Sequence, residues 1–210
     1  MYRLFFKGLL DRLFAFVVLL VLAPLFVVVA ALIWMEDGRP IFYRQLRVGK
    51  NRCSILVNKF RSMLHRPSRR PEEGGEIIGS HDEVTRTGAF IRRFKIDELP
   101  QLFNVLLGEM ALVGPRPCLP ASLKEFDENG MKRLQVLPGC TGLAQINGNI
   151  FLTWEERAKF DAYYVDHLSF TLDLWIFWRT LSVILFGDNN LVQRFDEFQG
   201  SREKKVVMHD

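Results

Sequence analysis

The sequence predicts a membrane-associated α/β protein with one main domain, in which an apolar N-terminal helix precedes a small sheet and several amphipathic helices. Two observations support this prediction. The 210-residue chain has 49% hydrophobic and 25% charged residues, which suits one folded core and excludes an intrinsically disordered protein. Leu13 to Trp34 is a run of 22 residues without a charge, which excludes an ordinary soluble protein. We expect a membrane segment over residues 1–36, a main domain over 37–190 and a C-terminal tail over 191–210.

The apolar run is long enough to cross a bilayer. As a straight helix it would measure roughly 33 Å, whereas a hydrocarbon core is about 30 Å thick. The run is too long for a signal peptide and is not followed by a small-residue cleavage site. No second run of this kind occurs in the sequence, which excludes a multi-span transporter.

Pro24 lies near the centre of the run and predicts a bend, because proline lacks the N–H that would continue the helix. Lys and Arg residues flank the run on both sides. Such flanks are typical of the cytoplasmic side of a membrane, so this distribution favours a re-entrant helix that enters and leaves on one side. A single span with a proline kink is the alternative.

The next stretch is strongly basic. From Arg39 to Arg70 the chain has ten Lys or Arg residues and no Asp or Glu, although its net charge is only +4. Such a patch suits anionic lipid head groups or a phosphate-bearing substrate. Lys59 follows the strand-like run Ile55 to Val57 and is therefore a candidate substrate contact. The patch lacks interleaved aromatic residues, which argues against nucleic-acid binding. Residues 67–80 are mostly turn formers and charges and predict a surface loop.

Asp97 and Glu98 form an acidic pair that follows the basic, helix-like segment over residues 90–95. Neighbouring residues on a helix point about 100° apart, so we expect the two carboxylates to have different roles. One interpretation is structural, with Asp97 capping a helix whose first turn contains Pro100. The other is that the pair carries out chemistry. The three cysteines and four histidines are scattered, which favours a reducing compartment and predicts neither a disulfide framework nor a zinc centre.

Two turn-rich segments favour the chemical interpretation. In Gly114-Pro115-Arg116-Pro117, two prolines fix the backbone around an arginine that can bind an oxyanion. Over residues 138–148, Gln145 and Asn147 lie two residues apart, on one side if the backbone is extended. Carboxylates, cations and amides together suit phosphoryl transfer, in which a carboxylate attacks phosphorus while Mg²⁺ and arginines screen the phosphate charge.

On these residues the sequence resembles the monotopic phosphoglycosyl transferases, bacterial sugar transferases that start glycoconjugate assembly on polyprenol phosphate. The resemblance extends from Lys7 to about Thr180. It rests on five ordered motifs: Lys7-x-x-x-Asp11-Arg12, Lys59-Phe60-Arg61-Ser62-Met63, Ile96-Asp97-Glu98-Leu99-Pro100-Gln101, Gly114-Pro115-Arg116-Pro117 and Pro138-Gly139-x-Thr141-Gly142-Leu143-Ala144-Gln145-x-Asn147-Gly148.

The resemblance implies a two-step reaction. Asp97 would attack the β-phosphate of a UDP-sugar, releasing UMP and leaving a phosphosugar on the enzyme, which undecaprenyl (polyprenol) phosphate then collects. Glu98 would be the second catalytic residue, assisting with Mg²⁺ or the acceptor, and Mg²⁺ would bind at Asp97. The residues expected to bind substrate are Lys59, Arg92, Arg116, Gln145 and Asn147.

The resemblance also implies that the apolar run is re-entrant and broken at Pro24. Lys7, Asp11 and Arg12 would tie its base to a catalytic domain on the cytoplasmic face of the bacterial inner membrane. The expected partners are the UDP-sugar, polyprenol phosphate, membrane phospholipids and downstream glycosyltransferases of glycan, O-antigen, capsule or exopolysaccharide synthesis, with no nucleic acid. Three positions depart from the family pattern and bear on the bend, on a phosphate contact and on the choice of sugar: Ala23, Asn149 and Glu83.

The last third of the chain predicts two helices and a tail. The apolar spacing of Trp154 to Leu168 predicts an amphipathic helix. We expect Asp161 and Asp166 on it to be solvated, and the alternative is that they support the site from behind its contact residues. Leu172 to Phe186 is too short to span a bilayer at roughly 22 Å, and predicts an interfacial helix, with a buried core helix as the alternative. From Gln199 onward the chain is polar and is expected to fray.

Two rival functions follow from the same residues. In the first, the protein is a membrane-anchored scaffold that binds lipid or a partner, and Asp97 is only a helix cap. In the second, it is a transferase that works by direct displacement, and Asp97 only holds Mg²⁺.

Overall fold

The computed structural model describes residues 2, 6–64, 83–186 and 192–207, which form a mixed helix and sheet fold. The predicted loop over residues 67–80 lies outside the described residues. One antiparallel sheet pairs β1 (Phe42–Val48) with β2 (Ser54–Phe60), and one parallel sheet pairs β3 (Ala111–Val113) with β4 (Gly139–Thr141). The helices are α1 (Lys7–Asp37), α2 (Arg86–Arg93), α3 (Gln101–Leu107), α4 (Glu128–Lys132), α5 (Leu143–Ile146), α6 (Trp154–Asp166), α7 (Phe170–Phe186) and α8 (Phe195–Val207).

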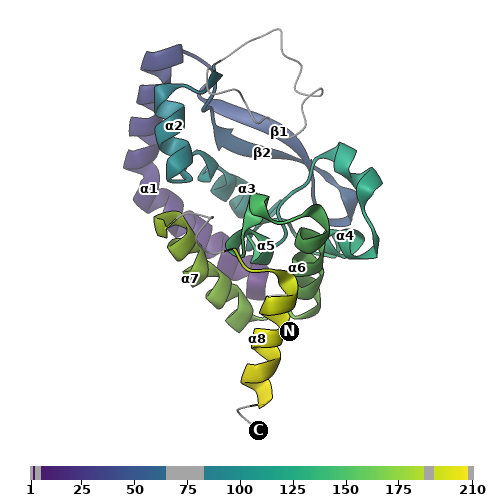
Figure 1. Ribbon diagram of the computed structural model, residues 1–210. Coiled ribbons are helices and arrows are strands. Elements are labelled where there is room, and N and C mark those ends of the chain that lie inside the picture. Colours follow the sequence, from purple (N-terminus) through teal and green to yellow (C-terminus); the bar gives the residue numbers. More distant parts are fainter. Residues whose placement is uncertain (1, 3–5, 65–82, 187–191, 208–210) are drawn as a thin grey trace.

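The apolar run forms a single helix, α1, with Pro24 inside it. The helix passes along one side of the molecule, beside α2 and α3 (Figure 1). Val29 and Ile33 are buried against Phe60 of β2 and Ile91 of α2. Only 11% of the most apolar 18-residue stretch of α1 is buried, so most of the apolar surface of this helix faces outward. A large exposed apolar surface of this kind fits membrane association.

Buried charges tie the first turns of α1 to the main domain. Lys7 Nζ lies 2.6 Å from the Asp173 carboxylate of α7 and 3.4 Å from Asp11. Asp173 also accepts hydrogen bonds from the hydroxyls of Tyr2 and Tyr164, each at 2.7 Å. Each carboxylate buried here therefore has a partner, as buried charges require.

The predicted anchor Arg12 packs over the end of α3. Gly108 ends this helix with φ 80°, in the left-handed region that favours glycine, and a Cβ at this position would lie 2.1 Å from Arg12 Nη2. The guanidinium therefore sits at the carboxyl end of α3, where a cation interacts favourably with the helix dipole.

The last turn of α1 is also attached to the main domain. Arg61, which follows β2, pairs with Asp37 at 3.2 Å and donates to the Asp37 carbonyl at 2.9 Å. The Glu36 carboxylate accepts hydrogen bonds from the backbone N–H groups of Arg86 and Thr87, at 2.6 and 2.9 Å. It therefore caps the start of α2, where free N–H groups and the helix dipole favour an anion.

Helices α6 and α7 confirm the two helices predicted for the last third of the chain. Asp166 is exposed and pairs with Lys132, as expected for a solvated carboxylate. The same prediction is wrong for Asp161, which is only 2% exposed and pairs with the buried Arg133 at 3.1 Å. Its position on α6 gave no sign of the buried cation, because Arg133 lies 28 positions earlier in the sequence.

The expectation of a frayed tail is wrong for the residues of α8. Phe198 is buried in the main core, where its ring contacts Phe160, Tyr163 and Trp175. The polar composition from Gln199 onward concealed this, since the apolar anchors of the helix precede that residue. Burial of large aromatic side chains is enough to hold a short terminal helix in place.

Candidate active site

Two side chains that are far apart in the sequence, Lys59 and Arg116, meet at Glu98. Lys59 Nζ lies 2.6 Å from Glu98 Oε1, and Arg116 Nη2 lies 2.9 Å from the same oxygen. Lys59 belongs to β2, Glu98 to a 3₁₀ turn over Ile96–Glu98, and Arg116 to the segment after β3. The structure therefore brings together members of three of the predicted motifs around one carboxylate.

Asp97 lies on the same 3₁₀ turn, and its interpretation as a helix cap is wrong. Lys95 precedes the turn with φ 57°, a left-handed conformation that separates the turn from α2. The next helix, α3, has Pro100 at its N-cap and no side-chain hydrogen bond there. Asp97 therefore stands on a turn between two helices and caps neither of them.

The Asp97 carboxylate combines burial with a lack of hydrogen bonds. It is 9% exposed, and no hydrogen-bond donor in the described part of the chain is paired with it. Burial, followed by the neighbouring charge of Glu98, raises its pKa to about 6, while Lys59, Arg92 and Lys95 oppose this shift. At neutral pH it is therefore an ionised carboxylate that neither water nor a donor fully stabilises.

Glu98 has the opposite electrostatic character. Burial also disfavours its charged form, but Arg116 and Lys59 outweigh burial and hold the pKa of Glu98 well below its usual range. Glu98 therefore stays ionised and paired. The two adjacent carboxylates therefore differ in their surroundings, since Glu98 is held in ion pairs and Asp97 has no donor paired with it among the described residues. That they have different roles stays a prediction.

Arg92 approaches from the last turn of α2. Its Nε donates to Ser62 Oγ at 2.8 Å, which fixes the guanidinium beside β2 and near enough to Asp97 to lower the pKa of that carboxyl. Two contributors here were not predicted as site residues. Ser62 lies in the motif that begins at Lys59, and this position could have indicated it as a site residue. Nothing in the sequence indicated the left-handed backbone of Lys95.

Gln145 and Asn147 do not share one side of an extended segment, because residues 143–146 form α5. In a helix, positions two apart point about 200° from each other. Asn147 is fully buried and donates to the Leu143 carbonyl at 2.8 Å, and Gln145 donates to the Cys140 carbonyl at 3.1 Å. Their contact with substrate stays a prediction.

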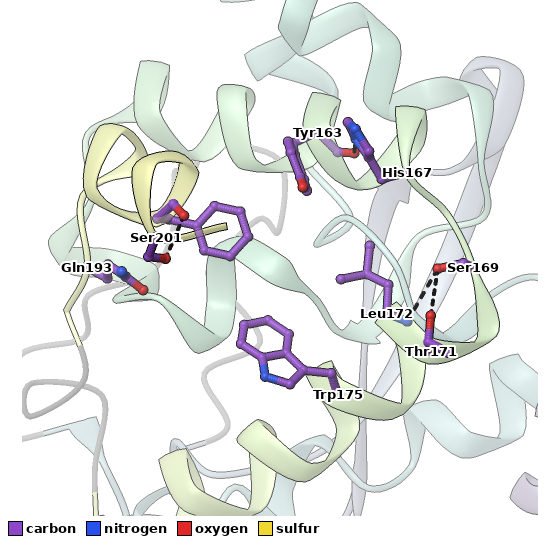
Figure 2. A pocket seen from close by; sticks show the side chains of 9 residues that line it. Tyr163, His167, Ser169, Thr171, Leu172, Trp175, Gln193 and Ser201 are labelled. Carbon is purple, nitrogen blue, oxygen red and sulfur yellow. Dashed lines mark hydrogen bonds between the residues drawn. The ribbon is translucent and has the colours of Figure 1, made fainter. Parts of the chain in front are cut away.

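A separate cavity of about 420 Å³ lies at the junction of α6, α7 and α8 (Figure 2). Tyr163 lines it from α6, His167 from the residue that follows α6, Trp175 from α7 and Ser201 from α8. None of the described residues that line this cavity belongs to the predicted site. The ion-paired cluster at Glu98, and not this cavity, therefore carries the functional argument.

The acidic side chains suit a magnesium site whose ligands come partly from the substrate better than a site built from protein side chains alone. Within the described ranges, no group of three His, Cys, Asp or Glu residues is placed to hold a metal. Mg²⁺ in enzymes of phosphate compounds is usually held by one or two carboxylates together with substrate phosphates and water. Asp97, with no hydrogen-bond donor paired to it in the described chain, fits that arrangement, whereas Glu98 is already occupied by Lys59 and Arg116.

The chain is similar to known proteins over nearly its whole length. A family model described as bacterial sugar transferase matches residues 2–187. An uncharacterized sugar transferase, EpsL, of Bacillus subtilis (strain 168) is 37% identical over 182 residues, which cover 87% of this chain and 88% of EpsL.

Two further relatives carry more specific names. A UDP-N-acetylgalactosamine-undecaprenyl-phosphate N-acetylgalactosaminephosphotransferase of Aeromonas hydrophila is 37% identical over 190 residues, covering 87% of this chain and 44% of the relative. An undecaprenyl-phosphate glucose phosphotransferase of Komagataeibacter xylinus is 39% identical over 194 residues, which cover 87% of this chain and 36% of the relative. The residues matched by the family model include Lys59, Asp97, Glu98 and Arg116.

Proposed function

This chain belongs to the bacterial sugar transferase family, and from that membership we propose that it transfers a phosphosugar from a UDP-sugar to undecaprenyl phosphate. The products are UMP and a polyprenol-diphosphate-sugar. One observation carries the proposal: Asp97 is buried with no hydrogen-bond donor paired to it among the described residues, beside a Glu98 that Lys59 and Arg116 hold ionised. The acceptor follows the printed names of the relatives from Aeromonas hydrophila and Komagataeibacter xylinus.

The proposed reaction has two displacements at one phosphorus atom. An Asp97 carboxylate oxygen attacks the β-phosphorus of the UDP-sugar, a P–O bond forms to Asp97, and the bond to the bridging oxygen breaks so that UMP leaves. An oxygen of undecaprenyl phosphate then attacks the same phosphorus, and the bond to Asp97 breaks. Asp97 is suited to the first attack because, being buried and ionised, it is less stabilised than a solvated carboxylate.

Cations around the pair support the same steps. Lys59, Arg92 and Arg116 supply positive charge close to the place where the diphosphate must lie, which offsets its repulsion from Asp97. Asp97 together with the substrate phosphates would hold Mg²⁺, which, when bound, adds charge stabilisation at the phosphate oxygens. Glu98 keeps Lys59 and Arg116 in place.

The electrostatics favours this reaction over the two rivals. A scaffold gives no reason for an ionised, buried carboxylate with which no described residue pairs a hydrogen-bond donor, since such a group destabilises the fold. A carboxylate that served only as a magnesium ligand would not need the separation from water that raises the pKa of Asp97 to about 6.

We also propose that α1 is re-entrant, with both ends on the cytoplasmic face of the inner membrane. The support is that Lys7 at its start and Glu36 and Asp37 at its end all contact the same main domain, which a helix emerging on the opposite face could not do. Membrane-impermeant maleimide should label neither Gly8→Cys nor Arg39→Cys in intact cells, and both in inverted vesicles, in a Cys53→Ser background. Labelling of either position from outside would establish a spanning helix.

Activity with a panel of donors tests the function. Because two relatives of nearly equal identity are named for different sugars, similarity does not select the donor. We expect the purified protein, given Mg²⁺ and undecaprenyl phosphate, to release UMP from at least one of UDP-glucose, UDP-galactose, UDP-N-acetylglucosamine and UDP-N-acetylgalactosamine. Release of UDP in place of UMP would contradict the proposal, because it would place the bond cleavage at the sugar. The product is suited to a downstream glycosyltransferase that extends a polyprenol-linked sugar.

A further inference from the structure

Hydrogen bonds to its backbone carbonyls hold the segment over residues 115–118, which carries Arg116. Four consecutive carbonyls of this segment accept hydrogen bonds, and the donors come from three other parts of the chain. The pairs are Pro115 with the Gly139 N–H at 2.9 Å, Arg116 with Arg133 Nη2 at 2.7 Å, Pro117 with Arg47 Nη1 at 3.3 Å and Cys118 with the Val48 N–H at 2.9 Å. Two of these four donors are arginine side chains, and the one from Arg133 is directed at Arg116 itself.

Arg133 is itself fixed from several directions. It is 6% exposed and pairs with the buried Asp161 at 3.1 Å. Its guanidinium lies over the rings of Phe126 and Trp154, with 5.4 and 5.3 Å from its central carbon to the ring centroids. A planar guanidinium can stack on rings while it donates to a carboxylate and a carbonyl, which the compact ammonium of lysine does less well.

A purely stabilising role explains this arrangement poorly. A buried ion pair adds little net stability, because the loss of hydration offsets the attraction between the charges. A fixed donor on the Arg116 carbonyl has a different consequence. It sets where the Arg116 side chain begins, and that side chain ends 2.9 Å from Glu98 beside the reactive carboxylate.

We propose that Arg133 is a positioning residue for the transfer reaction, which acts through the Arg116 backbone to place the Arg116 guanidinium on Glu98. The proposal rests on the proposed function. Asp161, Phe126 and Trp154 hold Arg133 in the orientation that this requires. A displacement of about 1 Å at a site of this kind can lower the rate about a hundredfold.

Single substitutions test the contact, with a control at the preceding residue, Lys132, whose partner also lies on α6. Arg133→Met should lower kcat/KM for UMP release by roughly ten- to a hundredfold, and Arg133→Lys should recover part of the loss, since it keeps a donor. The control Lys132→Met removes the neighbouring exposed pair with Asp166 and should stay within about twofold. Full activity in Arg133→Met, or an equal loss in Lys132→Met, would overturn the proposal.

A double-mutant cycle separates positioning from general damage to the fold. If Arg133 acts through Arg116, then Arg133→Met should cost much less in a background that already carries Arg116→Lys, so the two losses should not multiply. Losses that multiply would show an independent, structural role and overturn the proposal. Should Arg133→Met fail to fold, the cycle is run with Arg133→Lys.

Amide hydrogen exchange over residues 114–119 tests the contact without any substrate. Exchange should be faster in Arg133→Met than in the wild type and unchanged in Lys132→Met, and unchanged exchange in Arg133→Met would overturn the proposal. If the wild type released UMP from no donor, the proposed function would fail while this comparison still decided whether Arg133 holds the segment.

Discussion

Replacing Asp97 by asparagine should abolish phosphosugar transfer, lowering kcat by at least about a thousandfold, because the amide cannot attack phosphorus. UMP release at saturating donor and undecaprenyl phosphate measures the loss. The matched control is Asp166→Asn, which changes an exposed aspartate of α6 and should leave kcat within about twofold. Retention of substantial activity by Asp97→Asn would exclude Asp97 as the nucleophile.

The same substitution should make the protein more stable. A carboxyl whose pKa rises from 3.8 unfolded to about 6 folded binds its proton more tightly in the folded state, so ionisation destabilises the fold as pH rises. Asp97→Asn should therefore increase the free energy of unfolding by up to about 3 kcal/mol above pH 6, by roughly half of that near pH 5 and by only about 0.5 kcal/mol near pH 4. Thermal unfolding in detergent at these pH values measures the gain, and a gain that does not depend on pH would contradict the assigned environment of Asp97.

Removing the buried cation at the base of α1 should have the largest effect on stability. Lys7→Met leaves the Asp173 and Asp11 carboxylates buried without their shared cation. An unpaired buried charge costs about 3 to 5 kcal/mol, so the melting temperature should fall sharply. The exposed pair of Lys132 and Asp166 provides the comparison, because Lys132→Met should cost no more than about 1 kcal/mol.

A second substitution distinguishes charge imbalance from lost packing. Adding Asp173→Asn to Lys7→Met removes one of the two uncompensated charges and should recover part of the lost stability. If the double variant is less stable than Lys7→Met, the anchor depends on packing and hydrogen bonds of Asp173, such as those from Tyr2 and Tyr164, more than on charge.

The periodic and strongly apolar elements could be predicted from the sequence. The run from Leu13 to Trp34 and the amphipathic pattern of α6 each specify a helix locally, and both occur as expected. The residues of the cluster at Glu98 could be singled out because they lie in motifs that resemble those of a known family, but their meeting depends on contacts between segments far apart in the sequence.

The rest depends on contacts that a local pattern does not contain. Asp161 looked like a solvated helix residue because its partner Arg133 is distant in the sequence. The interpretation of Asp97 as a helix cap stayed open because the left-handed backbone at Lys95 and the N-cap of α3 at Pro100 were not evident from composition. Gln145 and Asn147 would lie on one side only in an extended backbone, and nothing in the local pattern distinguished that from the short helix that residues 143–146 form.

The central claim is that a phosphosugar is carried covalently on Asp97, and the intact mass of the protein tests it most directly. Purified wild type and Asp97→Asn are incubated with Mg²⁺ and each UDP-sugar, without undecaprenyl phosphate. We predict a mass gain of one phosphosugar on the wild type, absent from Asp97→Asn and lost when undecaprenyl phosphate is added. UMP release that requires undecaprenyl phosphate, with no mass gain for any donor, would contradict the covalent mechanism and establish direct displacement.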